Sequence, residues 1–298
     1  MTKVVNKDIS EQFYMDRDGN LVPIPVSNNA LIEKMFAHLP TRMIMKFVSA
    51  PWYANLQRMA MNTFFTSFLV SGFVHKNGIK LSEYKKKKYT SFHDFFKRDI
   101  KPESRPFTVD DKALLSPCDC KASVYKIAED ASFKIKGVPY TAGEVLDDEE
   151  LAKEFCGGYM YLLRLSLDDY HHYMYPVAGD KTADRKIDGK LYTVHPLIHQ
   201  YCAVYRENAR QFCTITTDRG DRVIVMQVGA LGVGKVANDN EDAARVAQGE
   251  EQGHFEFGGS TILVLTSAGS YEPEESLREN TQLGYETIVK MGERIGGI

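Results

Sequence analysis

Reactive side chains occur in four short stretches of an otherwise structural sequence. Asp119 follows a Ser-Pro pair, His171 and His172 follow two carboxylates, His195 precedes a proline, and Ser260 follows two glycines. A histidine titrates near neutrality, so it can take a proton from a serine hydroxyl and return it, while a carboxylate orients the ring. The serine lacks the G-x-S-x-G context of the common serine hydrolases. The set therefore indicates a serine nucleophile of another kind.

The glycine–serine stretch has two interpretations. Gly258 and Gly259 stand between two strand-like runs, "GHFEF" and "STILVLT", and such a pair is typical of a hairpin turn. Alternatively, Ser260 is placed so that its hydroxyl can attack the peptide bond before it. Each of the other stretches also has a structural interpretation, because buried histidines are often hydrogen-bonded core residues and Asp after Ser-Pro is a frequent turn former.

Composition limits the class of protein. The chain has 298 residues, 43% of them apolar and 26% charged, which is typical of a soluble globular protein. A net charge of −3 argues against binding to nucleic acid.

The first residues contain no apolar signal-peptide region, and residues 60–74 are too short and too polar to cross a bilayer. Five scattered cysteines suit a reducing compartment, and the Cys118/Cys120 pair has no second pair at zinc spacing, so no metal site is expected.

The N-terminal part of the chain has helical periodicity. Residues 28–86 place apolar side chains three or four positions apart, with Asn28 or Asn29 as a cap and breaks at Pro40 and Pro51. Basic residues occur between the apolar ones, and a lysine run follows at 84–88. This pattern is typical of an amphipathic layer on an anionic membrane surface, or of helices that pack on the core or on a dimer partner.

Short β-rich runs broken by Gly, Pro and Asp follow the lysines, and only 146–155 and 281–295 have a helical pattern there. One of the predicted strand runs is "KLYTVHPL", residues 190–197. We therefore expect an α+β fold: a helical N-terminal region over 1–86, then a β-rich, sandwich-like or barrel-like catalytic core over 87–298.

Taken in order, the motifs resemble those of the phosphatidylserine decarboxylase family, whose members are pyruvoyl-dependent and process themselves. The likeness covers most of the chain, and its specificity comes from the order of motifs that are each weak alone. They are "SFHDFFKRDIKPESRPF" (91–107), "SPCDC" (116–120), "DYHHYMYP" (169–176), "TVHPL" (193–197), "ENARQ" (207–211), "VGALGVGKVAN" (228–238) and "FGGST" (257–261).

The resemblance implies a self-cleavage between Gly259 and Ser260, giving a long chain and a short chain of 39 residues, 260–298. Ser260 would become a pyruvoyl group, which forms a Schiff base with a substrate amine and accepts the electrons released with carbon dioxide. The implied reaction converts phosphatidylserine to phosphatidylethanolamine. Asp119 would act in the processing relay and His171 as an acid and base.

The sequence departs from the family pattern at four positions. Met174 stands where many members carry the second histidine that partners the serine, His172 where arginine is usual, His195 where asparagine is usual, and Cys120 where glycine is usual. Methionine cannot move protons. We therefore expect His171 to be the base, with His195 or His172 in reserve.

Three functions follow as hypotheses. The first is phosphatidylserine decarboxylation by a peripheral enzyme on the cytoplasmic face of the cell membrane, as a homodimer of the two-chain unit. The second keeps the pyruvoyl chemistry but acts on a free amino acid, another amine-bearing carboxylate. The third is an unprocessed, non-catalytic binding relative, for which Met174 is the best support.

Overall fold

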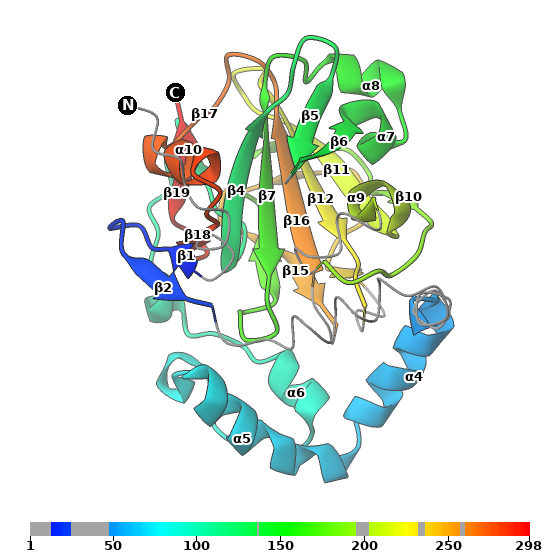
Figure 1. The fold of residues 1–298 in the computed structure, drawn as a ribbon, viewed down its shortest axis with the longest axis vertical. Coiled ribbons are helices and arrows are strands. Elements are labelled where there is room, and N and C mark those ends of the chain that lie inside the picture. The colour runs from blue at the N-terminus through cyan, green and yellow to red at the C-terminus, as the bar shows by residue number, and fades with distance from the viewer. Residues whose placement is uncertain (1–12, 25–47, 136, 195–202, 232–235, 257–259) are drawn as a thin grey trace.

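A large open sheet forms the centre of the molecule (Figure 1). The computed structural model describes residues 13–24, 48–135, 137–194, 203–231, 236–256 and 260–298. In spatial order the strands are β14 (Ala244–Val246), β9 (Gly179–Lys181), β11 (Arg210–Thr216), β12 (Arg222–Val228), β16 (Ser260–Thr266), β7 (Tyr159–Leu165), β4 (Cys120–Lys126), β18 (Thr287–Val289), β1 (Phe13–Met15) and β2 (Leu21–Pro23), and β10 (Arg185–Ile187) pairs with β11.

Both faces of this sheet are buried, which explains the continuous apolar runs of its central strands. All seven residues of β16 are buried, and the strand pairs antiparallel with β12 on one side and β7 on the other. Leu263 and Leu265 belong to one hydrophobic cluster, whereas Ile262 and Val264 belong to another. The side-chain alternation of a strand thus supplies two cores, one on each face.

Short elements cover the two faces. The first core contains residues from the β5–β6 hairpin and three short helices: β5 (Ser132–Ile135), β6 (Val138–Thr141), α7 (Ala142–Leu146), α8 (Glu149–Lys153) and α9 (Val204–Glu207). The second core contains residues from two small sheets and one helix: β13 (Val236–Asn238) with β15 (Glu251–Phe255) and β8 (His172–Met174), β17 (Glu272–Pro273) with β19 (Arg294–Gly297) and β3 (Ala113–Leu115), and α10 (Glu275–Gln282).

The N-terminal helices lie beyond one end of the central strands, where α4 and α5 diverge from a common turn (Figure 1). They are α4 (Pro51–Met61), η1 (Phe64–Thr66), α5 (Ser67–Asn77), η2 (Leu81–Glu83), α6 (Phe92–Phe96) and η3 (Pro102–Ser104). Pro51 stands at the start of α4, where its missing N–H costs no hydrogen bond. Gly78 ends α5 with a left-handed backbone, φ 63°. No helix among the described residues is long and apolar enough to cross a bilayer.

The structure confirms the α+β class and the helical character of residues 48–77. Within the described residues the sheets do not close into a barrel. Asn28, Asn29 and Pro40 lie outside the described residues. The domain boundary at residue 86 stays a prediction.

Three element predictions need correction. The helix predicted over 281–295 is wrong beyond Gln282, because Gly284 takes a left-handed backbone, φ 88°, and the β-branched run 287–289 then pairs with β4. The helix predicted over 146–155 starts at Glu149 instead, after Asp147 takes a left-handed conformation and Asp148 caps the new helix. The strand predicted over 190–197 is reduced to an isolated bridge at Lys190 in its described part.

Candidate active site

Ser260 lies at the start of the most buried strand. It is the first residue of β16 and is paired with Leu165, the last residue of β7. Its side chain is fully buried, and among the described residues neither Ser260 Oγ nor the neighbouring Thr261 Oγ1 has a hydrogen-bond partner. Buried hydroxyls without partners cost free energy, and other buried polar groups of the described chain share this feature, so the position of Ser260 at the start of β16 is what makes it a candidate. Gly258 and Gly259, and with them the hairpin-turn interpretation, lie outside the described residues.

His171 lies in the connection between β7 and β8 with its proton position fixed. Its Nδ1 is 3.0 Å from the carbonyl oxygen of Asp169. A carbonyl oxygen only accepts, so Nδ1 of the neutral ring must be the donor and Nε2 carries the lone pair. Nε2 is buried and has no partner in the described part of the chain, while the ring packs 4.0 Å from the ring of Phe96. Among the described residues, the arrangement leaves the lone pair of Nε2 without a partner.

The electrostatic surroundings keep His171 neutral. Burial lowers the pKa of the His171 imidazole well below its usual value, and the positive charge of Arg98 lowers it further. A neutral imidazole can accept a proton from a hydroxyl at neutral pH, which an imidazolium cannot do. The site therefore holds His171 in the neutral form, which is the form that a general base requires.

The loop that carries His171 is anchored by buried charged groups. Arg98 donates from Nη2 to the carbonyl oxygens of Asp168 and Asp169, each at 2.8 Å. The Asp169 carboxylate accepts from the backbone N–H of Ser166 and from Nζ of Lys121, both at 2.7 Å. These bonds fix the backbone on both sides of the loop, so the carbonyl that orients His171 is itself held in place.

Two chain connections bring His171 and Ser260 to the same end of the sheet. One connection runs from Leu165 to His171 and the other from Phe255 to Ser260. Ser260 pairs with Leu165, and the N–H of Phe255 donates to the carbonyl oxygen of His171 at 2.9 Å. In the sequence, five residues (166–170) separate Leu165 from His171, and four (256–259) separate Phe255 from Ser260. Ser260 Oγ and His171 Nε2, both buried and without a hydrogen-bond partner among the described residues, therefore lie on segments at the same end of the sheet.

Asp119 is held by cations rather than by a histidine. Its carboxylate accepts from Nε and Nη2 of Arg105, at 2.8 and 2.5 Å, and from the backbone N–H of Met291 at 2.9 Å, while Nζ of Lys290 lies at 3.5 Å. Burial raises the pKa of the Asp119 carboxyl, but the hydrogen bonds from Arg105 and the charges of Lys290 and Arg105 outweigh it and leave the pKa below its usual value. Asp119 is an anion buried in an ion pair.

Met174 explains why Asp119 has no imidazole partner in the described chain. The methionine is buried in β8, donates its N–H to the carbonyl of Pro117 at 2.9 Å, and shares a small apolar cluster with Met291. Met291 is the residue whose N–H binds Asp119. At the position of the second family histidine, this chain therefore places a thioether in apolar packing, where no proton can pass.

His172 is committed to other partners. Its Nδ1 lies 2.6 Å from Oε1 of Glu251, and its ring is stacked between Tyr170, at 4.9 Å, and His254, at 5.0 Å. His195, the other reserve residue, lies outside the described residues. Of the candidate histidines that the structure describes, only His171 combines full burial with a ring nitrogen that has no partner.

The sequence analysis singled out Asp119, His171 and Ser260 but missed the residues that hold them: Phe96, Arg98, Arg105 and Lys121. Three of these stand in the stretch 91–107 that carries the family resemblance, so a signal for them existed. Lys121 had none, because only the pairing of β4 with β7 brings it to Asp169. No group of three possible metal ligands occurs in the described ranges.

Comparison with known proteins assigns the class. The family model for phosphatidylserine decarboxylase matches residues 92–297. "Phosphatidylserine decarboxylase proenzyme 2" of Clostridium acetobutylicum is 35% identical over 294 residues, which are 98% of this chain and 97% of that protein. A phosphatidylserine decarboxylase proenzyme of Chlamydia caviae is 32% identical over 292 residues, 95% of this chain and 97% of its own. The chain belongs to the phosphatidylserine decarboxylase family.

The histidines of the site predict how stability depends on pH. Burial, and then the charge of His172, lower the pKa of His254 to about 4, whereas an unfolded histidine titrates near 6.5. The unfolded state binds more protons between these values, so stability is lost as pH falls from about 6.5 to about 4. Urea unfolding at pH 7.5 and at pH 5 gives the free energy of unfolding at each pH. We expect the decrease in this free energy from pH 7.5 to pH 5 to be smaller in His254→Gln than in the native chain by about 1–2 kcal/mol, after allowance for solvent screening. The matched control is His75→Gln, at an exposed position on α5. An equal dependence of the free energy of unfolding on pH in His254→Gln and in the native chain would contradict the prediction.

Proposed function

We propose that this chain is a precursor that cleaves itself between Gly259 and Ser260 and then decarboxylates phosphatidylserine to phosphatidylethanolamine. The observation that carries the proposal is the pair of buried atoms without partners in the described residues, the Ser260 hydroxyl and the Nε2 of a neutral His171, on segments at the same end of the sheet. A nucleophile and an oriented base at the same end of a sheet are the two groups that covalent catalysis requires. Family membership supports the same reaction.

The residues fit a pyruvoyl group formed from Ser260. The serine is fully buried, and the two hydroxyls at the start of β16 are not occupied by hydrogen bonds within the described chain. A pyruvoyl group at this position supplies a ketone that takes up a substrate amine and accepts the electron pair left when carbon dioxide departs.

Cleavage can be written with the residues in place. His171 Nε2 takes the proton of Ser260 Oγ, which attacks the carbonyl of Gly259; the amide C–N bond breaks, an ester C–O bond forms, and the nitrogen receives the proton. Loss of the Ser260 α-proton then expels the carboxylate of Gly259. Addition of water and release of ammonia leave the ketone. In each later turnover, His171 is the group placed to hold a proton and return it to carbon.

The position of β16 implies that the two products stay together. The short chain of residues 260–298 would contribute a strand hydrogen-bonded on both sides, together with α10, β18 and β19. All seven strand residues are buried between two cores. Burial of this much apolar surface stabilises the association without a covalent link.

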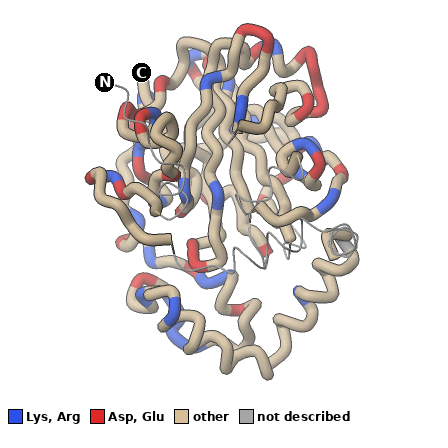
Figure 2. Tube along the Cα trace, viewed as in Figure 1, with Lys and Arg blue, Asp and Glu red and all other residues tan. Residues whose placement is uncertain are grey.

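The helices below the sheet support work at a membrane surface. Large apolar side chains are exposed along α4 and at the turn into α5: Trp52, Leu56, Met59, Phe64, Phe65 and Phe68. Figure 2 shows that the junction of these helices is largely free of charged residues, while Lys and Arg lie along the segment beside α5. Soluble proteins rarely expose so large an apolar patch, and lysines next to it attract anionic lipid. We place the enzyme peripherally, on the cytoplasmic face of the membrane; a dimer interface on the same patch is the alternative.

The first prediction of the proposed function concerns cleavage. The native protein should denature into a chain of residues 1–259 and a 39-residue fragment whose carbonyl N-terminus reacts with hydroxylamine, whereas Ser260→Ala should remain one 33.7 kDa chain. The fragments should co-elute until denaturant is added, because β16 is an inner strand. Intact-mass spectrometry measures both. Ser267→Ala, just beyond the far end of β16, is the matched control and should still cleave; an uncleaved native chain would favour the non-catalytic relative.

A second prediction separates the two adjacent histidines. His171→Gln should slow self-cleavage by about 100-fold or more, because removal of a general base costs about that much. His172→Gln should change the rate by less than about tenfold, since that ring is bound to Glu251. Both rates can be followed as loss of the intact chain after synthesis in vitro. The reverse ranking would assign the base to His172 and overturn the assignment to His171.

The third prediction concerns the substrate. Carbon dioxide release from phosphatidylserine in mixed vesicles should exceed that from free amino acids, and Ser260→Ala should abolish it. The altered packing at Met174 is the observation that favours the free-amino-acid alternative, because it changes the family site itself. Release from a free amino acid and none from the lipid would establish that alternative.

A further inference from the structure

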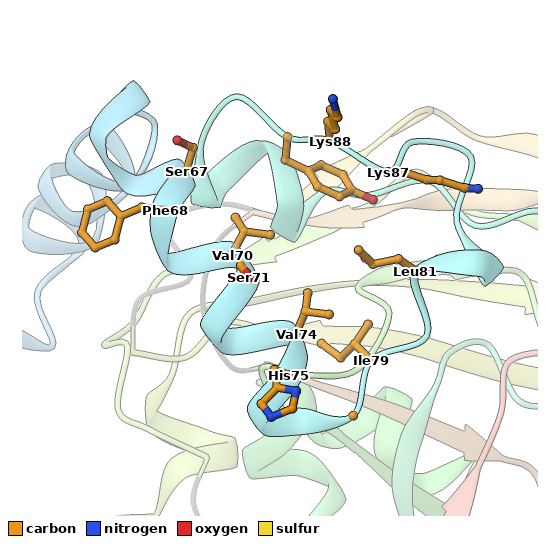
Figure 3. Close-up of a pocket in the computed structure, with 12 residues that line it drawn as sticks. Ser67, Phe68, Val70, Ser71, Val74, His75, Ile79, Leu81, Lys87 and Lys88 are labelled. Atoms are coloured by element: carbon orange, nitrogen blue, oxygen red, sulfur yellow. The ribbon is translucent and has the colours of Figure 1, made fainter.

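We propose that a groove between α5 and the segment 79–89 binds one anionic phospholipid, separately from the reaction at Ser260. The groove has a volume of about 820 Å³ and is lined by α5 residues from Ser67 to His75 on one side and by Ile79, Leu81 and residues 87–89 on the other (Figure 3). It shares no lining residue with the site around Ser260 and His171. The inference therefore goes beyond the proposed reaction.

The floor of the groove is suited to a hydrocarbon chain. Val70 is buried there, and Val74, Ile79 and Leu81 pack against the same small hydrophobic cluster, which contains Phe92 and Phe95 of α6. Ligand sites of this size are typically apolar, with a few polar groups that fix the orientation of the ligand. Here the branched side chains form a continuous apolar surface, and Figure 3 shows them between the helix and the facing segment.

The rim supplies positive charge. Lys87 and Lys88 line the groove, their side chains are exposed, and neither forms an ion pair with any residue that the structure describes. Lys86, by contrast, is 2.6 Å from Asp94. The lysines are neighbours in sequence, although Figure 3 shows their side chains pointing in different directions, and positive charge at the edge of an apolar floor is complementary to a phosphate next to an acyl chain. A zwitterionic lipid would satisfy them less well, because its own cation opposes them.

The neighbourhood favours a lipid over a second copy of the chain. Phe68 lines the groove and is 75% exposed, and Phe64 and Phe65, 74% and 80% exposed, continue the apolar surface outward. A two-fold dimer formed through this groove would place the same patch against itself. Lys87 and Lys88 would then approach their own copies, which like-charge repulsion disfavours. A lipid surface meets both the aromatic rim and the lysines.

The test uses short-chain phosphatidylglycerol below its micelle concentration, because this anionic lipid carries no amine for the reaction. Native mass spectrometry of the Ser260→Ala protein and of the native protein should show one bound lipid in each. Phosphatidylcholine of the same chain length and glycerophosphoglycerol without chains should bind at least about tenfold more weakly, since each lacks one of the two complementary features. Equal binding in the two proteins shows that the site is independent of the processed serine.

Two variants locate the site. Ser71→Trp fills the groove from an exposed helix position, and the double variant Lys87→Glu/Lys88→Glu reverses its charge; each should weaken binding by about tenfold or more. Gly72→Trp adds the same ring next to Ser71 in open space, and Lys112→Glu/Lys134→Glu makes the same charge change at exposed positions outside the groove. Both controls should bind normally.

Three results would overturn the proposal: equal binding of phosphatidylcholine, equal binding of the headgroup without chains, or normal binding by both groove variants. A groove that instead joins two copies would give dimers that Ser71→Trp dissociates, without bound lipid. Because no arm depends on carbon dioxide release, failure here and failure of the proposed reaction are distinguishable.

Discussion

The hydrogen bond from His171 Nδ1 to the carbonyl oxygen of Asp169 is the interaction on which the site depends. It fixes the tautomer, so the lone pair must be on Nε2, and burial together with Arg98 keeps the ring neutral. The same carbonyl oxygen of Asp169 also accepts a hydrogen bond from Nη2 of Arg98, which helps to hold it in place. A buried arginine, usually a cost to stability, here satisfies two backbone oxygens and also opposes protonation of the base.

The sheet supplies the other half of the arrangement. Ser260 begins a strand whose two neighbours and two cores leave it no freedom to move away from the β7 end. Its hydroxyl is consequently shielded from water and has no hydrogen-bond partner within the described chain. A surface turn would leave the same serine hydrated and weakly nucleophilic. Under the proposed cleavage, the strand also keeps the short chain in the sheet, so one element serves nucleophile placement and product retention.

The site could be predicted from the sequence only where the information is local. Ser260 and His171 stand in short motifs with recognisable spacing, whereas Lys121 reaches Asp169 through strand pairing that no local pattern contains. The same limit explains the wrong helix over 281–295: three- and four-residue spacing continues past Gln282, but the backbone turn at Gly284 and pairing with β4 override it. The α+β class was predictable because the change from helical to β-rich composition near residue 86 is large.

Under the proposed cleavage, the surroundings of Asp119 and Met174 favour a base, His171, that is not linked to a carboxylate within the described chain, and the relay role of Asp119 stays a prediction. The Asp119 anion is satisfied by Arg105, Lys290 and the N–H of Met291, and Met174 fills the neighbouring space with apolar contacts. A histidine in place of Met174 would have to be desolvated, and its pairing with Asp119 would draw the carboxylate away from Arg105, which costs several kcal/mol by the usual penalty for breaking a buried ion pair. A base oriented by a backbone carbonyl avoids that competition. Under the proposed cleavage, the methionine at position 174 is therefore physically compatible with a His171 that a backbone carbonyl orients.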